Sequence, residues 1–477
     1  MAEFTGESRM YHGVAQGTQA QFVESQDQRN VATRRHPLCC SKRLLILILM
    51  FLRCFLSVLV TCSIHIAFIE LSNLSFKVGV TELQIPSYEI ITFTYHFGFL
   101  FSPIGGYLAT KFGGSVTYGF TSMLASMLTA LNPATLQWNV YIFSACRIAA
   151  GLFDGFAYAS IAEIFTRWVP AKERSTSLAI VLTGFYIGNT FFYIIPAYIA
   201  SSWGWQTAFY ATGAITFVWS VVWLIIARNE PSEDKTISQR ELQYIQSQTD
   251  ATPRHQVVHP ILKILTSLPV WAMCIGEFAS SWGYDLIASS LPIYFRDATG
   301  RSMTQISTIS VMPILVSICI TPILGVIMDL MPNYIKLEVS QIHKIAITFG
   351  FSTSCILFAI AFFSNNIMLS ITCLLVIKLL LSFNLFVLQV VCLYLAPKHS
   401  SILLGFSAIW PIGSKFVVPF FLQFIVKQFI LQEWQLCFLL SSGALLFGTF
   451  VYWKFGSSQL QPWATSHPHR TYERELQ

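Results

Sequence analysis

Charged residues are scarce in this chain. Only 11% of its 477 residues are Asp, Glu, Lys or Arg, whereas 54% are hydrophobic and 15% are aromatic, and the mean hydropathy is +0.59. Soluble globular domains carry about 25% charged residues. The shortage therefore excludes an ordinary soluble protein and predicts that most of the chain lies in a lipid bilayer. The net charge of +6 gives no reason to expect a nucleic-acid partner.

Sequence signatures of catalysis and of metal binding are also missing. The chain has no glycine-rich phosphate-binding loop, no histidine cluster with metal-ligand spacing and no nucleophile elbow. Its eleven cysteines show neither metal nor disulfide spacing, and most stand singly within apolar runs as small hydrophobic residues. We therefore expect neither an enzyme nor a bound metal or cofactor.

Long apolar runs make up most of the chain. A helix needs about 20 apolar residues to cross a bilayer, and about twelve such runs can be marked. One long hydrophilic stretch divides them into six and six. This layout predicts an all-α membrane protein of about twelve transmembrane helices in two six-helix bundles. The expected parts are a disordered cytosolic tail (1–41), an N-terminal bundle (42–227), a cytosolic linker (228–267), a C-terminal bundle (268–456) and a cytosolic tail (457–477). The expected spans lie near 44–69, 88–110, 115–136, 140–163, 176–200, 207–227, 268–294, 305–328, 344–363, 367–393, 400–426 and 434–454.

The cationic residues between the spans predict the orientation. Lys and Arg concentrate on the cytosolic side of membrane proteins, and most of these residues fall on one side if both termini are cytosolic. The opposite side then carries the glycosylation sequon at Asn73. The residues assigned to the cytosolic side are Arg34, Arg35, Lys42, Arg43, Lys111, Arg167, Lys172, Arg174, Arg228, Arg254, Lys263, Lys336, Lys344, Lys398 and Lys454.

An arginine and an acid stand inside one apolar run. Arg147 and Asp154 are seven residues apart, almost two helical turns, and so share one helix face. An ionised group in hydrocarbon costs at least ~2.5 kcal/mol, so such a pair predicts a polar cavity on a substrate or proton path. The Arg147 guanidinium suits an anionic substrate, or it only neutralises Asp154. A desolvated Asp154 can gain and lose a proton, which makes it the first candidate for the coupling acid.

Other polar residues in the apolar runs are weaker candidates for substrate or ion coupling. Lys415, His96 and His65 stand in expected spans. A single histidine in a membrane helix is often only a hydrogen-bonding group between helices. Lys378 could be a paired structural charge, and Glu277 could extend to the membrane surface.

The segment after the fourth expected span carries a second cluster of polar residues. We expect Trp168, Glu173 and Arg174 to act in gating on the cytosolic side rather than in substrate contact. Glu163 and Arg167 are four residues apart on the expected helix, which predicts a structural ion pair. Prolines such as Pro103, Pro196, Pro292, Pro322, Pro411 and Pro419 are expected to bend their helices.

The motifs of this region resemble those of a known family. The chain is similar to the anion-transporting branch of the major facilitator superfamily, which includes the vesicular glutamate transporters, sialin and the sodium-phosphate cotransporters. The resemblance implies a secondary active transporter that moves a small organic or inorganic anion by alternating access, coupled to protons or sodium, in the plasma membrane or a vesicular or lysosomal membrane. The matching residues run from Arg147 through Gly151, Asp154 and Gly155 to Trp168, Pro170 and Glu173-Arg174-Ser175, and continue with Gly184, Gly188, Gly204-Trp205, Ile237-Ser238, Glu241, Tyr244-Ile245, Ala396-Pro397 and Gln461-Pro462-Trp463-Ala464.

The chain departs from this family where the resemblance implies charged cavity residues. Thr61 and Ser280 stand where vesicular glutamate transporters carry arginines, and Ile91 stands in place of a histidine, with His96 five residues later. These departures leave open an alternative, a transport-inactive relative that acts as a receptor, scaffold or accessory subunit. If the cavity still binds anions, Lys415 is the expected replacement for the missing cations.

Overall fold

The computed structural model describes residues 41–78, 88–191, 194–249, 260–299, 303–363, 366–425 and 431–465. Within these ranges all regular elements are helices, and eight of them are long and apolar enough to cross a membrane. The prediction of an all-α membrane protein is confirmed, and the helix positions agree with the expected spans.

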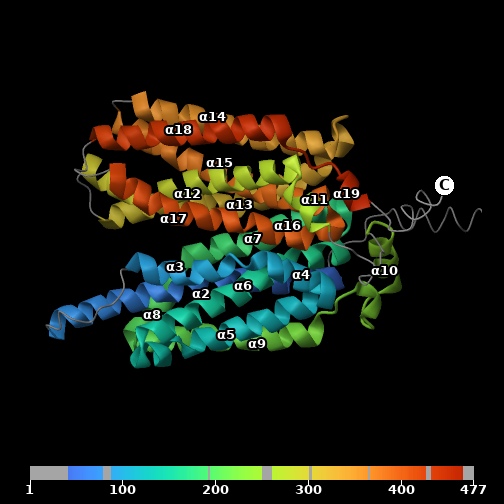
Figure 1. Cartoon of the computed structure of the whole chain (residues 1–477), viewed down its shortest axis with the longest axis horizontal. Coiled ribbons are helices and arrows are strands. Elements are labelled where there is room, and N and C mark those ends of the chain that lie inside the picture. Colours follow the sequence, from blue (N-terminus) through green and yellow to red (C-terminus); the bar gives the residue numbers. More distant parts are fainter. Residues whose placement is uncertain are drawn as a thin grey trace, which may run out of the picture.

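Two helical halves lie side by side (Figure 1). The N-terminal half contains α2 (Lys42–Val78), α3 (Tyr88–Phe99), α4 (Ser102–Phe112), α5 (Gly114–Trp138), α6 (Val140–Trp168), α7 (Arg174–Phe191), α8 (Ile194–Trp203) and α9 (Trp205–Ile226). The C-terminal half contains α12 (Leu268–Thr299), α13 (Met303–Tyr334), α14 (Val339–Phe363), α15 (Ile367–Leu395), α16 (Ser400–Ser407), α17 (Ile409–Ile425) and α18 (Leu431–Phe455). The short helices α10 (Gln239–Gln246) and α11 (Ile261–Leu265) belong to the segment between the halves, and α19 (Pro462–Thr465) follows the last span.

Two spans are broken at prolines. Proline has no backbone N–H, so Pro103 cannot bond the carbonyl four residues earlier, and α3 ends there, at Phe99. Pro411 likewise cannot bond the carbonyl of Ser407, which is the last residue of α16. In α4 the proline occupies the first turn, where a missing N–H costs nothing. The second and eleventh spans therefore consist of two helices each.

The linker helix α10 is attached to the N-terminal half. Ser238 caps α10 by accepting a hydrogen bond from the backbone N–H of Glu241 at 3.2 Å. The Glu241 carboxylate in turn accepts bonds from the backbone N–H groups of Lys42 (3.1 Å) and Arg43 (3.0 Å) at the start of α2. A carboxylate stabilises the positive end of a helix dipole. We call the end of the molecule where α10 lies the linker face, and the other end the opposite face (Figure 1).

Helix α2 is longer than expected. It was predicted to end near residue 69, but it continues to Val78, so the Asn73 sequon lies on helical backbone and not in a loop. The 37 residues of α2 span about 55 Å at about 1.5 Å per residue. A bilayer core is about 30 Å thick, so the C-terminal end of α2 lies beyond it on the opposite face.

Candidate functional site

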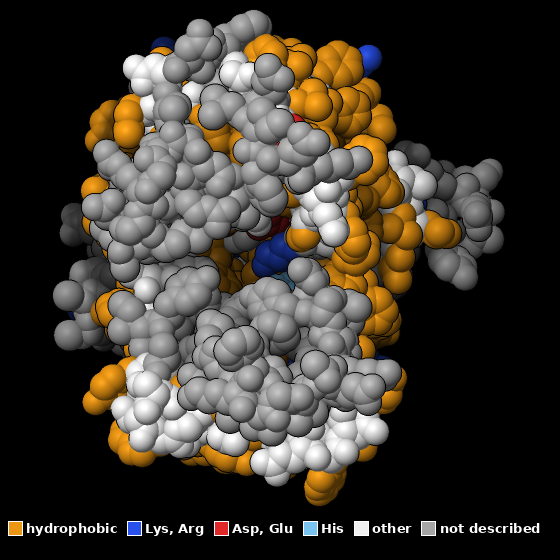
Figure 2. All heavy atoms as spheres, turned by 90° about the vertical axis from the view of Figure 1, so that its left-hand side faces the viewer, with side chains coloured by type: hydrophobic (Ala, Val, Ile, Leu, Met, Phe, Trp, Pro, Cys, Tyr) orange, Lys and Arg blue, Asp and Glu red, His pale blue; other side chains and the backbone are white. Residues whose placement is uncertain are grey.

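A cavity of about 370 Å³ lies between the two halves. The N-terminal half lines it through α2, α3, α5, α6 and α7, and the C-terminal half lines it through α12, α15, α16 and α17. Figure 2 looks onto the opposite face and shows basic, acidic and histidine side chains within a central hollow. The cavity therefore places groups of both signs between two structurally separate bundles.

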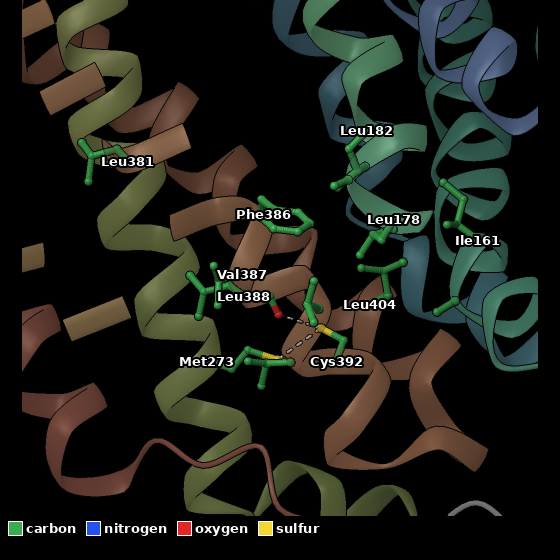
Figure 3. Close-up of a cluster of buried hydrophobic side chains, with 14 of the residues drawn as sticks. Ile161, Leu178, Leu182, Met273, Leu381, Phe386, Val387, Leu388, Cys392 and Leu404 are labelled. Carbon is green, nitrogen blue, oxygen red and sulfur yellow. Dashed lines mark hydrogen bonds between the residues drawn. The ribbon is translucent and has the colours of Figure 1, made fainter. Parts of the chain in front are cut away.

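The halves meet on the linker-face side of this cavity. Leu178 of α7 and Leu404 of α16 approach each other from opposite halves within one apolar cluster (Figure 3). The Ser102 hydroxyl donates to the carbonyl oxygen of Gly405 at 2.7 Å, and the Tyr394 hydroxyl donates to that of Ala171 at 2.9 Å. These contacts close the linker face, so the cavity communicates with the opposite face.

A carboxylate of the C-terminal half also caps a helix of the N-terminal half. Asp329 of α13 accepts hydrogen bonds from the backbone N–H groups of Ser175 (3.1 Å) and Thr176 (2.7 Å), in the first turn of α7. The first N–H groups of a helix have no intrahelical partner, so this cap satisfies two of them. The cap exists only while the two halves are together at the linker face.

The cavity contains a buried ion pair that the sequence interpretation missed. Asp154 pairs with Arg53 of α2, and it also accepts bonds from the hydroxyls of Ser57 (2.9 Å) and Tyr95 (2.7 Å). The Arg53 Nε donates to Ser122 at 2.9 Å. The only signal for Arg53 in the sequence is one arginine inside the first apolar run. Its partner is 101 residues away, so helical spacing could not identify it.

Arg147 occupies a different place from the one expected. It is buried in α6, and its guanidinium carbon lies 4.9 Å from the centre of the Tyr95 ring, in a cation–π contact. Tyr95 lines the cavity, whereas Arg147 lies behind it. The ion-pair partner of Asp154 in the structure is Arg53. The proposed roles of both residues in transport stay predictions.

Lys415 lies where the two halves face each other in the cavity. Its ammonium nitrogen is 3.4 Å from Nε2 of His96 on α3, so the two residues join the halves from α17 and α3. The neighbouring Ser414 hydroxyl donates to Asp285 of α12 at 2.6 Å, which places an acid close to the lysine. Two of the three weaker candidates are thus brought together. The side chain of His65 lies outside the described residues.

The remaining polar candidates divide between the cavity and the core. Thr61 lines the cavity, whereas Ser280 is completely buried and is not among the residues that line it. Lys378 is buried in α15, with its ammonium 5.4 Å from the centre of the Tyr284 ring. Glu277 of α12 is 2% exposed and lines the cavity.

The residues expected to act in gating have separate contacts. The Trp168 indole donates to the carbonyl oxygen of Arg228 at 3.0 Å, at the start of the linker. Glu173 accepts from Arg43 and from the Tyr244 hydroxyl, both at 2.8 Å, so it joins the linker to the N-terminal half. Arg174 does reach the C-terminal half, where its guanidinium carbon is 5.9 Å from the centre of the Tyr394 ring.

The structural ion pair expected near this segment is present. Glu163 and Arg167 are joined at 3.2 Å on α6. Their four-residue spacing was sufficient to predict the contact, because residues four apart lie about one turn apart on the same face of a helix.

Comparison with known proteins identifies the family. Residues 46–405, well over half of the chain, match the model of the Major Facilitator Superfamily. Vesicular glutamate transporter 1 of Xenopus laevis is 28% identical over 78% of this chain and 66% of its own length, and human vesicular glutamate transporter 2 is 27% identical over 96% and 82%. The proton:xylose symporter XylE superposes with a TM-score of 0.68 at 14% identity, over 87% of this chain and 96% of the symporter.

These findings confirm the resemblance inferred from the motifs, and the superposition shows a shared fold. The chain belongs to the Major Facilitator Superfamily and is an integral membrane transporter of small molecules.

Proposed function

We propose that this protein moves a small organic or inorganic anion across a membrane by alternating access, coupled to protons or sodium. The observation that carries the proposal is the cavity between the halves, which holds Lys415 and is closed at one end by contacts between those halves. Alternating access requires such a cavity, with contacts at one end that can separate while others form.

Lys415 is the proposed anchor for the anion. It is an exposed side chain on the cavity, so its charge is available to a solute. The Nε2 atom of His96 lies 3.4 Å from the Lys415 ammonium nitrogen. Asp285 also interacts with Lys415, so a bound anion would compete with Asp285 for the lysine. The relatives named for glutamate transport favour an organic anion. Arg147 contributes indirectly in this arrangement, by supporting Tyr95 beside Asp154.

We further propose that the linker face is cytosolic, with both termini on that side. The cationic residues assigned to the cytosolic side include Lys42, Lys111, Arg167 and Lys454, which all stand at helix ends on the linker face. The cavity would then open to the outside of the cell or to the lumen of a vesicle. The relatives with "vesicular" in their names favour a vesicle membrane.

Reconstitution of the purified full-length protein tests the function. Sialic acid, glutamate, urate and phosphate are offered to proteoliposomes while pH and sodium gradients are varied separately, with protein-free liposomes as the control. We expect concentrative uptake of at least one anion under one of the two gradients. If the folded protein moves none of them, the anion proposal is contradicted, and a role as a receptor, scaffold or accessory subunit becomes the better account.

A further inference from the structure

Glu277 lines the cavity but takes part in none of the contacts described above. It lies on α12, is 2% exposed and forms part of the cavity lining. Its Oε1 is buried without a hydrogen-bond partner in the described part of the chain. An ionised carboxylate without a partner is among the most costly groups to bury.

Among the described residues, the titratable groups that interact with Glu277 are neutral in their ordinary forms. They are Tyr158 of α6, Cys274 of α12, Cys392 of α15 and Tyr452 of α18. Phenols and thiols supply no positive charge to balance a carboxylate at neutral pH. A proton on Glu277 itself is the simplest way to remove the cost of burial.

Asp154 and Glu163 are also buried, but both have cationic partners. Asp154 pairs with Arg53 and accepts two hydroxyl hydrogen bonds, and Glu163 pairs with Arg167 at 3.2 Å. Opposite charge and hydrogen bonds to a carboxylate favour its ionised form. Among the described residues, the structure thus separates one buried acid that has no cation beside it from two that form ion pairs.

We propose that Glu277 is the proton-binding site that couples transport, in place of Asp154. The proposal rests on the proposed transport function and names its coupling ion as a proton. Glu277 takes up a proton while the cavity communicates with the opposite face, which converts the carboxylate to a neutral carboxyl. When the linker face opens, the N-terminal half moves away from Glu277, ionisation of the carboxyl becomes less costly and the proton leaves on the linker side. Tyr158 contacts this region from the N-terminal half, so the surroundings of Glu277 change as the halves move.

Infrared spectroscopy of the full-length protein in lipid nanodiscs tests the protonation directly, without any substrate. A protonated carboxyl gives a carbonyl stretching band that an ionised carboxylate lacks. At neutral pH we expect the band in the wild type, its loss in Glu277→Gln, and its retention in the matched control Glu163→Gln. If Glu277→Gln does not fold, Glu277→Asp serves instead, and the band should change in frequency. A band that is the same in the wild type and in the Glu277 variant overturns the proposal.

Transport of radiolabelled glutamate distinguishes this proposal from the proposed function. Proteoliposomes with Glu277→Gln should still exchange internal for external glutamate, but accumulation driven by a pH gradient should fall to the level reached without the gradient. Accumulation equal to that of the wild type contradicts the role of Glu277. Absence of uptake by the wild type contradicts glutamate as the substrate, while the infrared result still decides whether Glu277 binds a proton.

Discussion

Arg53 and Asp154 depend on each other because both charges are buried in the membrane interior of the N-terminal half. Removal of one partner leaves the other as an uncompensated buried charge, which costs about 3–5 kcal/mol. We therefore predict that Arg53→Met and Asp154→Asn each lower the thermal stability of the purified protein strongly. The double variant should recover part of the loss, because it leaves no unpaired charge.

Thermal unfolding followed by size-exclusion chromatography measures this coupling in a double-mutant cycle. Glu277→Gln is a useful comparison, because Glu277 has no cationic partner among the described residues and its replacement should cost little stability. If the effects of Arg53→Met and Asp154→Asn simply add, the two residues are not coupled.

Lys415 provides the second prediction at the scale of single residues. If its ammonium binds the anion, Lys415→Met should raise the substrate concentration for half-maximal uptake by about tenfold or more, since a charge-assisted hydrogen bond contributes about 1.5–3 kcal/mol. The measurement is initial uptake as a function of anion concentration in proteoliposomes. Lys172→Met removes an exposed lysine of the linker face and is the matched control. Unchanged concentration dependence in Lys415→Met would remove Lys415 from the binding site.

At the scale of helices, the backbones of α4 and α16 are in close contact at Gly106. A Cβ atom on Gly106 would overlap the backbone carbonyl of Ser401, and backbone cannot move aside as a flexible side chain can. We predict that Gly106→Ala prevents closure of the linker face and shifts the population towards the state that is open there. The control Gly443→Ala adds the same methyl group in α18, where nothing lies within 4 Å.

Spin labels at Lys111 and Lys336 measure this opening. Both side chains are exposed on the linker face, one in each half. Pulsed electron resonance should report a longer distance in Gly106→Ala than in the wild type or in Gly443→Ala. A distance distribution that does not change would show that the contact between α4 and α16 adapts to the methyl group.

The sequence predicted the helices well because each is encoded locally. An apolar run of sufficient length specifies a span regardless of its neighbours, and a four-residue spacing was enough for Glu163 with Arg167. The ends of helices were harder to place. Helix α2 continues beyond its apolar run to Val78, because a helix outside the bilayer need not be apolar.

The candidate site was predicted less well because it is assembled from distant segments. Asp154 was identified from its unusual place in an apolar run, but its partner Arg53 belongs to another helix. Arg147 was chosen because its spacing places it on the same helix face as Asp154. That spacing does not reveal which side chain of another helix contacts the two residues. Here Tyr95 contacts both of them.

For the whole molecule, the proposed orientation can be tested at Asn73. With the opposite face outside the cytosol, the C-terminal end of α2 carries the sequon beyond the bilayer core, where glycosylation is possible. We predict that glycosidase treatment changes the electrophoretic mobility of the wild type but not of Asn73→Gln. An epitope at the N-terminus should stain only in permeabilised cells if the protein is at the plasma membrane. Staining of intact cells would contradict the orientation.

The one-sided cavity has a pharmacological consequence. A blocker too polar to cross lipid can reach Lys415 only from the opposite face, because the linker face is closed by the contacts of Ser102 and Tyr394. Such a compound would act on cells from the medium if the protein resides at the surface. In a vesicle the same site would be shielded by the surrounding membrane, and inhibition would need a compound that permeates lipid or is trapped inside during endocytosis.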